Sequence, residues 1–495
     1  MSAPMELAVV GAGPAGMGAA AQAAELGVDV TLLDEQPAPG GQIYRGVDRV
    51  LGERPETARV LGEDYRRGAS LTAALRRSGA RHLADTAVWD LSVRDPDSGA
   101  LLPAGEGLTL GLLRAGRAEV RRARVVVVAS GAMERPVPVP GWTMPGVMSA
   151  GGVQTLLKAS GLVPGVPTAV VGSGPLVYLV AWQLARAGVS LAAVWVTVPW
   201  ARRLEAAPAM LAAVGEYGQI AKGLRWRREL RAMGVPLREG VRDVRVVGSE
   251  RAEGVVGQVG NTEQRVAAGL VVVHEGVIPS IALPRAAGCA LHHDALRAAW
   301  APRTDRFGAT SVDGVLVAGD AGGVAGALAA EAAGRLAGLE AARRLGRIDA
   351  GTRDRLALAP RRALERALRV RPFLDRLFRP RAEVLAPVDE AVVACRCEGV
   401  TVATLRRLAR AGCAGPNQAK AFSRCGMGPC QGRMCESTVA GVLAAGLRRD
   451  VESVGGYRVR APVKPLTVGE LAGLAGLDTP PEIVGGVPIG ARRRA

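Results

Sequence analysis

Six of the seven cysteines lie close together, between positions 395 and 435 of a chain of 495 residues. A group of thiols this dense suits a metal, because thiolates bind both iron and zinc. Zinc is usually held by C-x(2–4)-C pairs, so the C-x-C spacing of the first two cysteines favours a [2Fe-2S] cluster over zinc. Its four ligands are to be drawn from Cys395, Cys397, Cys413, Cys425, Cys430 and Cys435.

The spacing leaves two sets of ligands open. Cys430 forms a C-x4-C pair with Cys425 on one side and with Cys435 on the other, and either pair can complete a site begun by the C-x-C hairpin. A dithiol reductase is not expected, because the chain contains no C-x-x-C motif. The seventh cysteine, Cys289, stands apart and is expected to be a core residue.

A glycine-rich turn near the start of the chain has the pattern that binds a dinucleotide pyrophosphate. The apolar strand 7–10 runs into a G-x-G-x-x-G turn, and an alanine-rich helix follows. The glycines allow a tight turn and a close approach of the pyrophosphate, while the N–H groups at the helix start attract phosphate. A second strand ends at Asp34, where a carboxylate accepts hydrogen bonds from an adenosine ribose. The turn residues expected to contact the cofactor are Gly11, Gly13, Pro14, Ala15 and Gly16.

The same pattern recurs 161 residues later, around Gly174. Two differences bear on its function. Val177 takes the position of Gly16, and Trp195 takes that of Asp34, with no arginine in place of the acid to hold a 2′-phosphate. The second unit therefore either binds a nucleotide in an atypical way or serves as a structural domain. Binding of NAD(P)H through the usual contacts is not expected.

Later segments indicate which dinucleotide the first unit holds. The apolar strands 125–128 and 315–318 run into Gly131 and Asp320, at positions that close around FAD in flavoproteins with two dinucleotide-binding units. Asp320 is expected to bond the ribitol, and the helix that begins near Ala327 to face the flavin pyrimidine with its positive end. The FAD contacts expected here are Gly41, Gln42, Gly131, Ala132, Asp320, Ala327 and Leu328.

The order of these segments predicts an α/β protein with two Rossmann-like dinucleotide-binding domains, in the architecture of disulfide-reductase-like flavoproteins, and a small C-terminal helical iron–sulfur domain. The second unit is inserted into the first. His274, near the return to the first unit, is expected to be structural. The expected parts are 1–152 (FAD domain, first part), 153–265 (insert), 266–345 (FAD domain, second part), 346–385 (arginine-rich linker), 386–450 ([2Fe-2S] domain) and 451–495 (tail).

The net charge of +17 does not indicate nucleic-acid binding, because nearly all of the 63 basic residues are arginines spread along the chain and only 3% of residues are aromatic. One basic region stands out: residues 335–381 hold 14 arginines and 5 acidic residues. It is either a solvated helical face or a surface that docks an acidic partner. The chain shows no signal peptide, and a glycine turn interrupts the apolar run 166–185, so a cytoplasmic protein without a membrane span is expected.

Several motifs together resemble one protein family. They are SGAMERPVPVPGWTMPGVM at 130–148, HEGV at 274–277, AGD at 318–320, the cysteine-rich segment, and YRVRAPVKP at 457–465. This combination is similar to the FAD-containing α subunits of multi-subunit dye-linked dehydrogenases. The group includes the opine oxidase A subunit, the hydrogen cyanide synthase B subunit, D-hydroxyproline dehydrogenase α and, more distantly, sarcosine oxidase α.

The resemblance implies a division of labour between subunits. A β subunit similar to amino-acid oxidases would oxidise an imino acid, opine or small amino acid, and its electrons would pass to the FAD and [2Fe-2S] cluster of this chain. A small ferredoxin-like γ subunit would complete the complex. The chain would then be an FAD-dependent oxidoreductase subunit for CH–NH donors without a catalytic base of its own. The alternatives are an NAD(P)H-dependent ferredoxin reductase, which Trp195 disfavours, and a non-catalytic scaffold for the β subunit.

The resemblance also implies particular ligands. The cysteine-rich segment is similar to the bacterioferritin-associated-ferredoxin-like domain, whose C-x-C, long gap and C-x4-C layout points to Cys395, Cys397, Cys430 and Cys435, with Cys425 as the alternative to Cys435. In the first dinucleotide unit, the resemblance adds Glu35 and Val88 to the residues expected to bind FAD.

Overall fold

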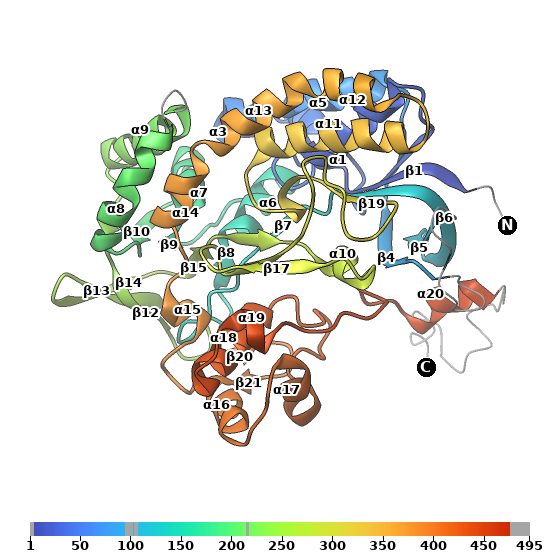
Figure 1. The fold of residues 1–495 in the computed structure, drawn as a ribbon. Coiled ribbons are helices and arrows are strands. Elements are labelled where there is room, and N and C mark those ends of the chain that lie inside the picture. The colour runs from blue at the N-terminus through green and yellow to red at the C-terminus, as the bar shows by residue number, and fades with distance from the viewer. Residues whose placement is uncertain (1–3, 95–101, 103–106, 214–216, 476–495) are drawn as a thin grey trace, which may run out of the picture.

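Two sheets with helices packed against them form the main body of the molecule, and a smaller helical region that carries the cysteines lies below them in Figure 1. The computed structural model describes residues 4–94, 102, 107–213 and 217–475. Residues 476–495 of the expected tail lie outside this part. Within the described residues, no helix is long and apolar enough to cross a membrane. The α/β fold class with a helical C-terminal region is confirmed.

The first sheet combines parallel strands with an antiparallel extension. Its parallel strands lie in the order β3, β2, β1, β6, β19, and β5 and β4 extend it from β6 as a meander. Strand β19 pairs with β6 although the whole second sheet lies between them in the sequence, so this unit is discontinuous. The strands are β1 (Met5–Val10), β2 (Val30–Leu33), β3 (Arg81–Leu83), β4 (Thr86–Ser92), β5 (Leu108–Arg114), β6 (Arg117–Val128) and β19 (Val315–Val317).

Helices α1 (Pro14–Ala24), α5 (Gly68–Arg77) and α11 (Ala327–Arg344) cover one face of this sheet (Figure 1). Small residues let α1 and α11 lie in close contact. A Cβ on Gly334 of α11 would lie 2.0 Å from the carbonyl oxygen of Ala15. This close packing brings the beginning of α11 next to the glycine turn before α1, which is where the functional site forms.

The second sheet is parallel, in the order β11, β10, β9, β15, β8. This sheet extends beyond the expected limits of the insert, 153–265. Strand β8 precedes that range in the sequence and β15 follows it, and both pair with strands of the sheet. Three-residue strands such as β8 leave no periodic pattern in the sequence. The elements are β8 (Val147–Ser149), α6 (Ala150–Ser160), β9 (Thr168–Ser173), α7 (Pro175–Arg186), β10 (Leu191–Val196), α8 (Trp200–Ala206), α9 (Gly218–Ala232), β11 (Leu237–Glu239), the meander β12 (Arg242–Val247), β13 (Gly254–Val259), β14 (Thr262–Ala267), and β15 (Leu270–Glu275).

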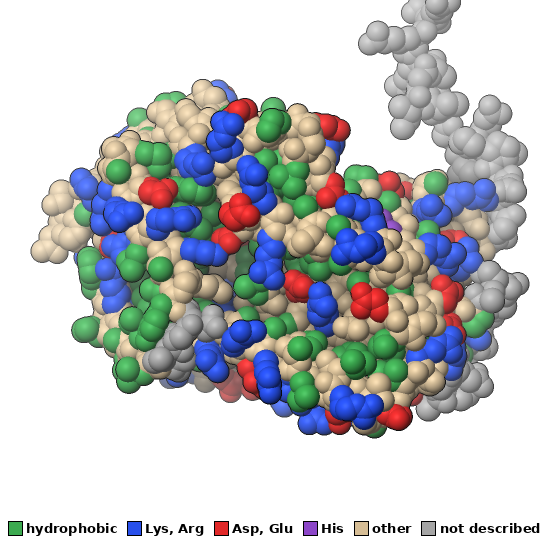
Figure 2. Space-filling model, turned by 90° about the horizontal axis from the view of Figure 1, so that it is seen from above, with side chains coloured by type: hydrophobic (Ala, Val, Ile, Leu, Met, Phe, Trp, Pro, Cys, Tyr) green, Lys and Arg blue, Asp and Glu red, His purple; other side chains and the backbone are tan. Residues whose placement is uncertain are grey.

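The arginine-rich linker is helical, and part of its charge is balanced within the chain. Buried Glu340 accepts hydrogen bonds from three arginines of the region, Arg343, Arg344 and Arg353. Although burial opposes it, these bonds lower the pKa of Glu340 to about 2. Figure 2 shows basic side chains dispersed over this face among acidic and apolar ones, which favours a solvated face. The linker helices are α12 (Ala350–Leu356), α13 (Leu358–Leu368), α14 (Arg371–Leu377) and α15 (Ala382–Leu385).

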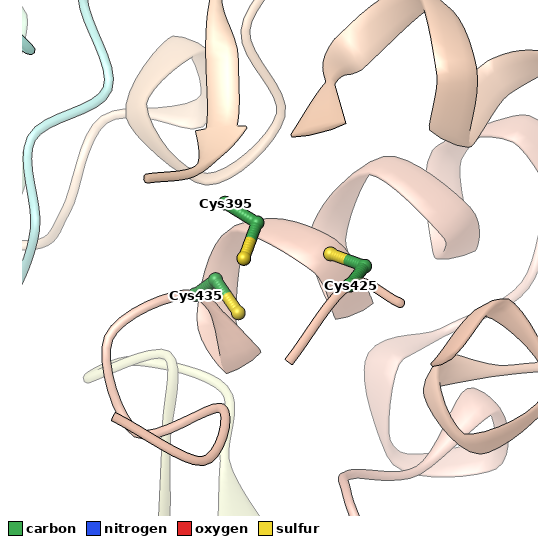
Figure 3. A group of neighbouring side chains, drawn as sticks. All are labelled: Cys395, Cys425 and Cys435. Atoms are coloured by element: carbon green, nitrogen blue, oxygen red, sulfur yellow. The ribbon is translucent and has the colours of Figure 1, made fainter. Parts of the chain in front are cut away.

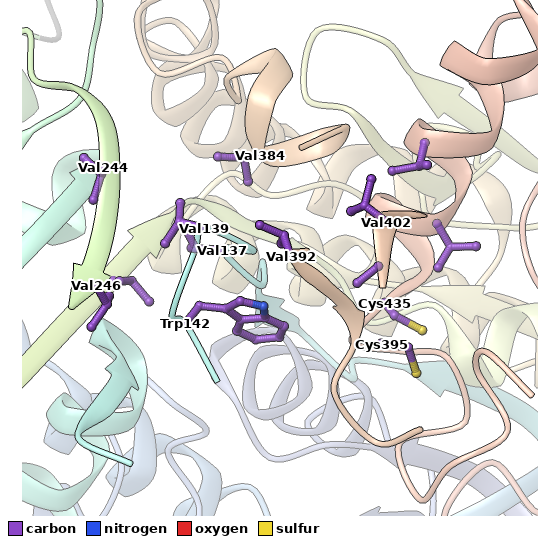
Figure 4. Packing of buried hydrophobic residues seen from close by; sticks show 14 of the residues in the cluster. Val137, Val139, Trp142, Val244, Val246, Val384, Val392, Cys395, Val402 and Cys435 are labelled. Carbon is purple, nitrogen blue, oxygen red and sulfur yellow. The ribbon is translucent and has the colours of Figure 1, made fainter. Parts of the chain in front are cut away.

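The cysteine-rich region is a small helical unit anchored to the second sheet. On α16, Val402, Leu405 and Ala409 are buried at helical spacing and pack toward α18. Trp142, which follows the first sheet, is buried among valines of both regions (Figure 4), and its Nε1 donates a hydrogen bond to the carbonyl oxygen of Val393 at 2.8 Å. The elements are β20 (Val393–Cys395), β21 (Val400–Thr401), α16 (Val402–Arg410), α17 (Pro416–Ser423), α18 (Glu436–Leu447), α19 (Val451–Val454) and α20 (Val468–Ala472).

Candidate functional site

The first glycine turn leaves open space at the beginning of α1. A Cβ on Gly16 would lie 1.7 Å from the carbonyl oxygen of Gly11, so Gly16 is required for packing of helix on strand. Gly13 differs. Its φ of −74° suits any residue, and a Cβ there would meet no protein atom closer than 3.8 Å. Because the protein itself does not require a glycine at this position, the space beside Gly13 and the first helical residues, Pro14 and Ala15, fits a bound phosphate group.

Asp34 lies at the carboxyl end of β2, beside this turn. Its Oδ2 accepts a hydrogen bond from the N–H of Ala12, and its Oδ1 accepts one from the N–H of Gln36 at 2.7 Å. The carboxylate is therefore fixed in position, with lone pairs left for ribose hydroxyls. Glu35 is exposed and forms an ion pair with Lys464. The side chain of Val88 on β4 is buried in the core, so a ligand would meet this residue through its main chain.

The segments expected to close around the flavin converge at the beginning of α1 and α11. The loop at Gly41 lies on the first glycine turn, since a Cβ on Gly41 would be 2.7 Å from the Cα of Gly13. Asp320 Oδ1 accepts hydrogen bonds from the N–H groups of Ala325 (2.8 Å) and Gly326 (3.1 Å), which fixes the loop that leads into α11 at Ala327.

Four further predicted residues lie at the edges of this region. The carbonyl oxygen of Gln42 accepts a hydrogen bond from Nζ of Lys158 on α6 at 3.0 Å, so the loop is tied to the second unit. Leu328, one residue into α11, is 44% exposed. Gly131 accepts a hydrogen bond from the N–H of Ser280 at 2.9 Å. Ala132 begins β7 (Ala132–Glu134), which pairs with β16 (Val277–Pro279) where the chain crosses between the two units.

A cavity of about 430 Å³ opens between the two units. Asp320 and Gly326 of the first unit line one side, and Gly174 and Pro175 of the second glycine turn line the other. The cavity therefore continues from the flavin-side loops into the space between the sheets. Its location at the carboxyl ends of the strands is where nucleotide cofactors bind in open α/β sheets. Its lining combines glycines and apolar side chains with charged residues that include Asp294, Asp320, Arg297 and Arg371.

The second crevice lacks the ribose acid. The residue that stands in its place, however, is not the one expected from the sequence. Val10 pairs with Leu33 in the first sheet, and its counterpart Val171 pairs with Trp195 in the second, so the counterpart of Asp34 is Val196 rather than Trp195. An irregularity in β10 between Leu191 and Ala193 shifts the register by one residue. Trp195 is a core residue, 1% exposed.

A buried ion pair closes the end of this second crevice. Glu275, at the end of β15, accepts hydrogen bonds from Arg381 of the linker at 2.8 Å and from Thr197 Oγ1 at 3.0 Å. Both members of the ion pair are almost inaccessible, with 0% and 5% of their side chains exposed. The linker residues Leu374 and Phe378 line the same cavity as Gly174. A segment of the chain itself therefore lies along the second glycine turn.

His274 is part of a neighbouring buried network. Its Nδ1 lies 2.6 Å from Oε1 of Glu134, whose Oε2 accepts a hydrogen bond from the N–H of Gly151 at 2.7 Å. The ring lies beside the second glycine turn, since a Cβ on Gly174 would be 3.2 Å from it. The side chain is 3% exposed, and His274 lines the cavity between the two units. Cys289 is a buried core residue, as predicted.

Three cysteines converge in the lower region. Their sulfurs all lie within 4.8 Å of one another, and all three side chains are buried: Cys395, Cys425 and Cys435 (Figure 3). Hydrogen bonds from the Cys425 and Cys435 thiols lower the pKa of Cys395 to about 2. The bond to the Cys395 sulfur raises the pKa of Cys425 to about 12. Three buried sulfurs this close to one another are a donor set that fits a thiophilic metal centre.

Cys397 and Cys430 form a second pair beside this group. Their thiols share a hydrogen bond, and partial burial, together with this contact, raises the pKa of Cys397. Cys397 is exposed and Cys430 is half-buried. The structure thus brings together Cys395 with Cys435, and Cys397 with Cys430, and it also places Cys425 within reach of the first pair. The sixth cysteine, Cys413, is hydrogen-bonded to the carbonyl oxygen of Gly415.

A few residues separate the cavity between the two units, which we call the flavin-side cavity, from residues 424–435, which we call the cysteine loop. A small cavity of about 50 Å³ lies against Gln431 and Glu436 of the cysteine-rich region. Pro279 and Ala299 line both this cavity and the larger one. Arg285 crosses the boundary, because its Nη1 donates hydrogen bonds to Glu436 and to the carbonyl oxygen of Tyr457. Pro279 and Ala299 therefore lie between the flavin-side cavity and a small cavity that borders the cysteine-rich region.

Four residues of these sites could not be assigned from the sequence. Arg381 and Lys158 give no signal, because a lone charged residue in a polar segment is normally exposed. Tyr457 and Lys464 belong to the YRVRAPVKP motif, but the motif alone does not give either residue a role. The ring of Tyr457 packs on Gly426, where a Cβ would lie 2.6 Å from Cζ of Tyr457. A glycine next to a cysteine of the cluster is therefore the feature of the sequence that could have indicated this contact.

Comparison with known proteins identifies the architecture. The pyridine nucleotide-disulphide oxidoreductase family model matches residues 5–346, and the sarcosine oxidase A3 domain model matches residues 395–474. The solved structure of L-proline dehydrogenase from P. horikoshii superposes with a TM-score of 0.65 at 20% identity, covering 95% of this chain and 79% of that one. The chain therefore has the fold of this flavoprotein group, and FAD is supported as the cofactor of the first crevice.

Two groups of curated relatives extend over nearly the whole chain. The opine oxidase A subunit of Agrobacterium tumefaciens (strain Ach5) is 42% identical over 473 residues, which is 95% of this chain and 92% of the relative. The hydrogen cyanide synthase subunit HcnB of Pseudomonas protegens is 32% identical over 478 residues, 92% of this chain and 95% of the relative. Because identity of this degree covers both chains almost completely, the protein belongs to the family of the opine oxidase A and hydrogen cyanide synthase B subunits, a family of flavin oxidoreductase subunits.

Proposed function

We propose that this chain is the FAD- and [2Fe-2S]-containing electron-transfer subunit of a multi-subunit oxidase or dehydrogenase that acts on CH–NH donors. The donor would be an imino acid, an opine or a small amino acid, oxidised on an amino-acid-oxidase-like β subunit. A ferredoxin-like γ subunit would be a further component. The observation that carries the proposal is that Pro279 and Ala299 line both the flavin-side cavity and the small cavity that borders the cysteine-rich region.

In this proposal the chain would hold two electron carriers in neighbouring regions. The FAD ligands would be the first glycine turn, Asp34, Asp320 and the beginning of α11. FAD takes up electrons in pairs or singly, and a [2Fe-2S] cluster carries them one at a time. The protein contributes the crevice that orients the dinucleotide and the helix start that faces the flavin with its positive end. It also contributes the thiol site, in which Cys395, Cys425 and Cys435 are buried and Cys397 is exposed.

For the cluster we propose Cys395, Cys397, Cys430 and Cys435 as ligands. The two close pairs, Cys397 with Cys430 and Cys395 with Cys435, would supply the four thiolates that such a cluster needs. Cys425 is the alternative to Cys435. Separate Cys425→Ser and Cys435→Ser variants test this choice through iron content and visible absorbance. We expect the Cys435 variant to lose the cluster and the Cys425 variant to keep it, and the opposite pattern would refute the assignment.

The rival function, an NAD(P)H-dependent ferredoxin reductase, is disfavoured by the second crevice. Val196 stands where a ribose acid would be required, and the pair formed by Arg381 and Glu275 closes the end of the sheet. Electrons would therefore enter from a partner protein. A scaffold function without redox chemistry would leave the open space beside Gly13 and the thiol group without a purpose.

The deciding experiment is anaerobic reduction of the chain purified with its partner subunits. We expect opines or small amino and imino acids to bleach the flavin absorbance and to give the electron paramagnetic resonance signal of a reduced [2Fe-2S] cluster. NADH should do neither. Bleaching by NADH in the isolated chain would support the ferredoxin reductase instead. Full amine-oxidising activity after removal of FAD and iron from this chain would support the scaffold.

A further inference from the structure

The segment from Tyr457 to Lys464 contacts both candidate cofactor sites. In Figure 1 it is part of the ribbon that leaves the cysteine-rich region after α19 and runs to the edge of the first sheet. Its first end lies on the cysteine loop. The buried Tyr457 hydroxyl donates to the carbonyl oxygen of Cys425 at 3.0 Å and lies 3.8 Å from the sulfur of Cys435. The ring packs against Gly432, where a Cβ would be 2.5 Å from Cδ2 of Tyr457.

The middle of the segment is held from two sides. Gln431 Nε2 donates to the carbonyl oxygen of Pro462 at 2.7 Å, and Arg433 Nη1 donates to that of Val463. Both donors belong to the cysteine loop. On the other side, the N–H of Val463 donates to the carbonyl oxygen of Trp89 on β4 at 2.7 Å, and the Val463 side chain is 3% exposed in the core of the first unit. The segment therefore connects the cysteine loop to β4 through hydrogen bonds.

The second end lies at the ribose position of the dinucleotide site. Lys464 forms an ion pair with Glu35 and lies within the electrostatic reach of Asp34. It is half-buried: burial lowers the pKa of Lys464, and the charge of Asp34 opposes this shift. The site that is expected to bind an adenosine ribose thus contains two carboxylates and one ammonium, and the ammonium comes from the far end of the chain.

We propose that residues 457–464 form a strap that couples the cysteine centre to the dinucleotide site, and that Lys464 holds the adenosine end of the bound dinucleotide. The proposal rests on the function proposed above. Lys464 balances the charge of Asp34 and Glu35 and offers N–H donors to the ribose or pyrophosphate oxygens. Tyr457 packs the other end of the strap against the cysteines. Binding of the dinucleotide and assembly of the metal centre then favour each other, since coupling between two sites is reciprocal.

The test compares three single variants with the wild type by titrating the flavin-free full chain with FAD. Lys464→Met should weaken FAD binding about 10-fold, and Lys464→Arg should restore it. Arg460→Met is the matched control, because Arg460 is an exposed cation of the same strap; it should bind FAD like the wild type. Thermal unfolding of each variant without FAD shows whether the fold is preserved.

A further variant tests the coupling. Arg433→Met removes one of the contacts between the strap and the cysteine loop without touching the ribose position. We expect it to weaken FAD binding several-fold and to lower the iron content. If Lys464→Met and Arg433→Met both bind FAD as tightly as the wild type, which itself contains FAD and iron, the strap is refuted and the proposed function stands. If the wild type contains no iron but Lys464→Met still loses FAD, the dinucleotide end of the strap stands and the electron relay fails.

Discussion

The two Rossmann-like units share a backbone plan and differ at the carboxyl ends of their strands. Each has a strand, a glycine turn and a helix that begins at a proline, at Pro14 and Pro175. In the first unit, Asp34 is fixed beside an open glycine turn. In the second, Val196 stands at that position, and the linker lies along the crevice. A few residues at the strand ends thus decide whether the same fold has a ribose site.

The two units also differ in the environment of an acidic residue at the end of a strand. The first unit presents Asp34 next to the space at Gly13. The second unit buries Glu275 against Arg381 and Thr197, so its charge is used inside the protein. Asp34 is 8% exposed and accepts its hydrogen bonds from main-chain N–H groups, whereas Glu275 is held by a buried arginine. The second unit has become the element on which the linker and the cysteine-rich region are anchored.

The largest effect is expected at the third glycine of the first turn. Gly16→Val places a Cβ 1.7 Å from the carbonyl oxygen of Gly11, which forces α1 off the sheet at a cost above about 4 kcal/mol. We expect no folded, flavin-containing protein, as measured by flavin absorbance and circular dichroism. The reciprocal change, Val177→Gly, should cost about 3 kcal/mol and leave flavin bound. Equal flavin loss in the two variants would contradict the comparison.

The next effect tests the closed crevice. Arg381→Met leaves Glu275 charged and buried without its partner, which should lower the free energy of unfolding by about 3–5 kcal/mol. The double variant with Glu275→Gln should recover most of this loss, because no unpaired charge remains. Chemical denaturation of the variants measures both effects. An Arg379→Met control removes a neighbouring arginine that lies outside this pair. A loss no larger than that of the control would show that the pair does not hold the crevice closed.

A smaller effect is expected at the ribose acid. Asp34→Ala removes the acceptor for Ala12 and Gln36 and for the ribose, so we expect FAD binding to weaken about 10- to 100-fold. Val196→Ala at the equivalent position of the second unit should leave FAD binding unchanged. Fluorescence titration with FAD measures both dissociation constants. A change of similar size in the two variants would mean that Asp34 acts only through the fold.

The sequence was sufficient for features that depend on local chemistry. The glycine turn, Asp34 at the strand end and Asp320 before α11 each follow from residue types at fixed spacing, and the α/β class follows from their order. The register of β10 could not be predicted, because a one-residue irregularity leaves no mark in an apolar run. The burial of Arg381 depends on Glu275, 106 residues away. The proximity of Cys425 to Cys395 depends on how two loops meet, which spacing does not determine.

The smallest effect concerns the contact between the two units. Lys158 on α6 is 4% exposed, and its Nζ donates to the carbonyl oxygen of Gln42 in the first unit and to Gln154 Oε1. Burial, with a further contribution from Arg45, lowers the pKa of Lys158 to about 7. The unfolded lysine titrates near pH 10.4, so between these values the unfolded chain binds the additional proton. The free energy of unfolding therefore rises with pH, by about 1.4 kcal/mol from pH 6 to pH 8.

Lys158→Met should remove this part of the pH dependence, as measured by urea unfolding at the two pH values. The control is Lys222→Met, because Lys222 also joins the two units but does so through an exposed ion pair with Asp64; it should keep the wild-type slope. An unchanged slope in the Lys158 variant would show that its ammonium is not desolvated. The slope of the wild type reports whether the second unit is docked on the loop at Gln42. Since that loop belongs to the FAD crevice, the second unit would then support the first cofactor site without binding a nucleotide of its own.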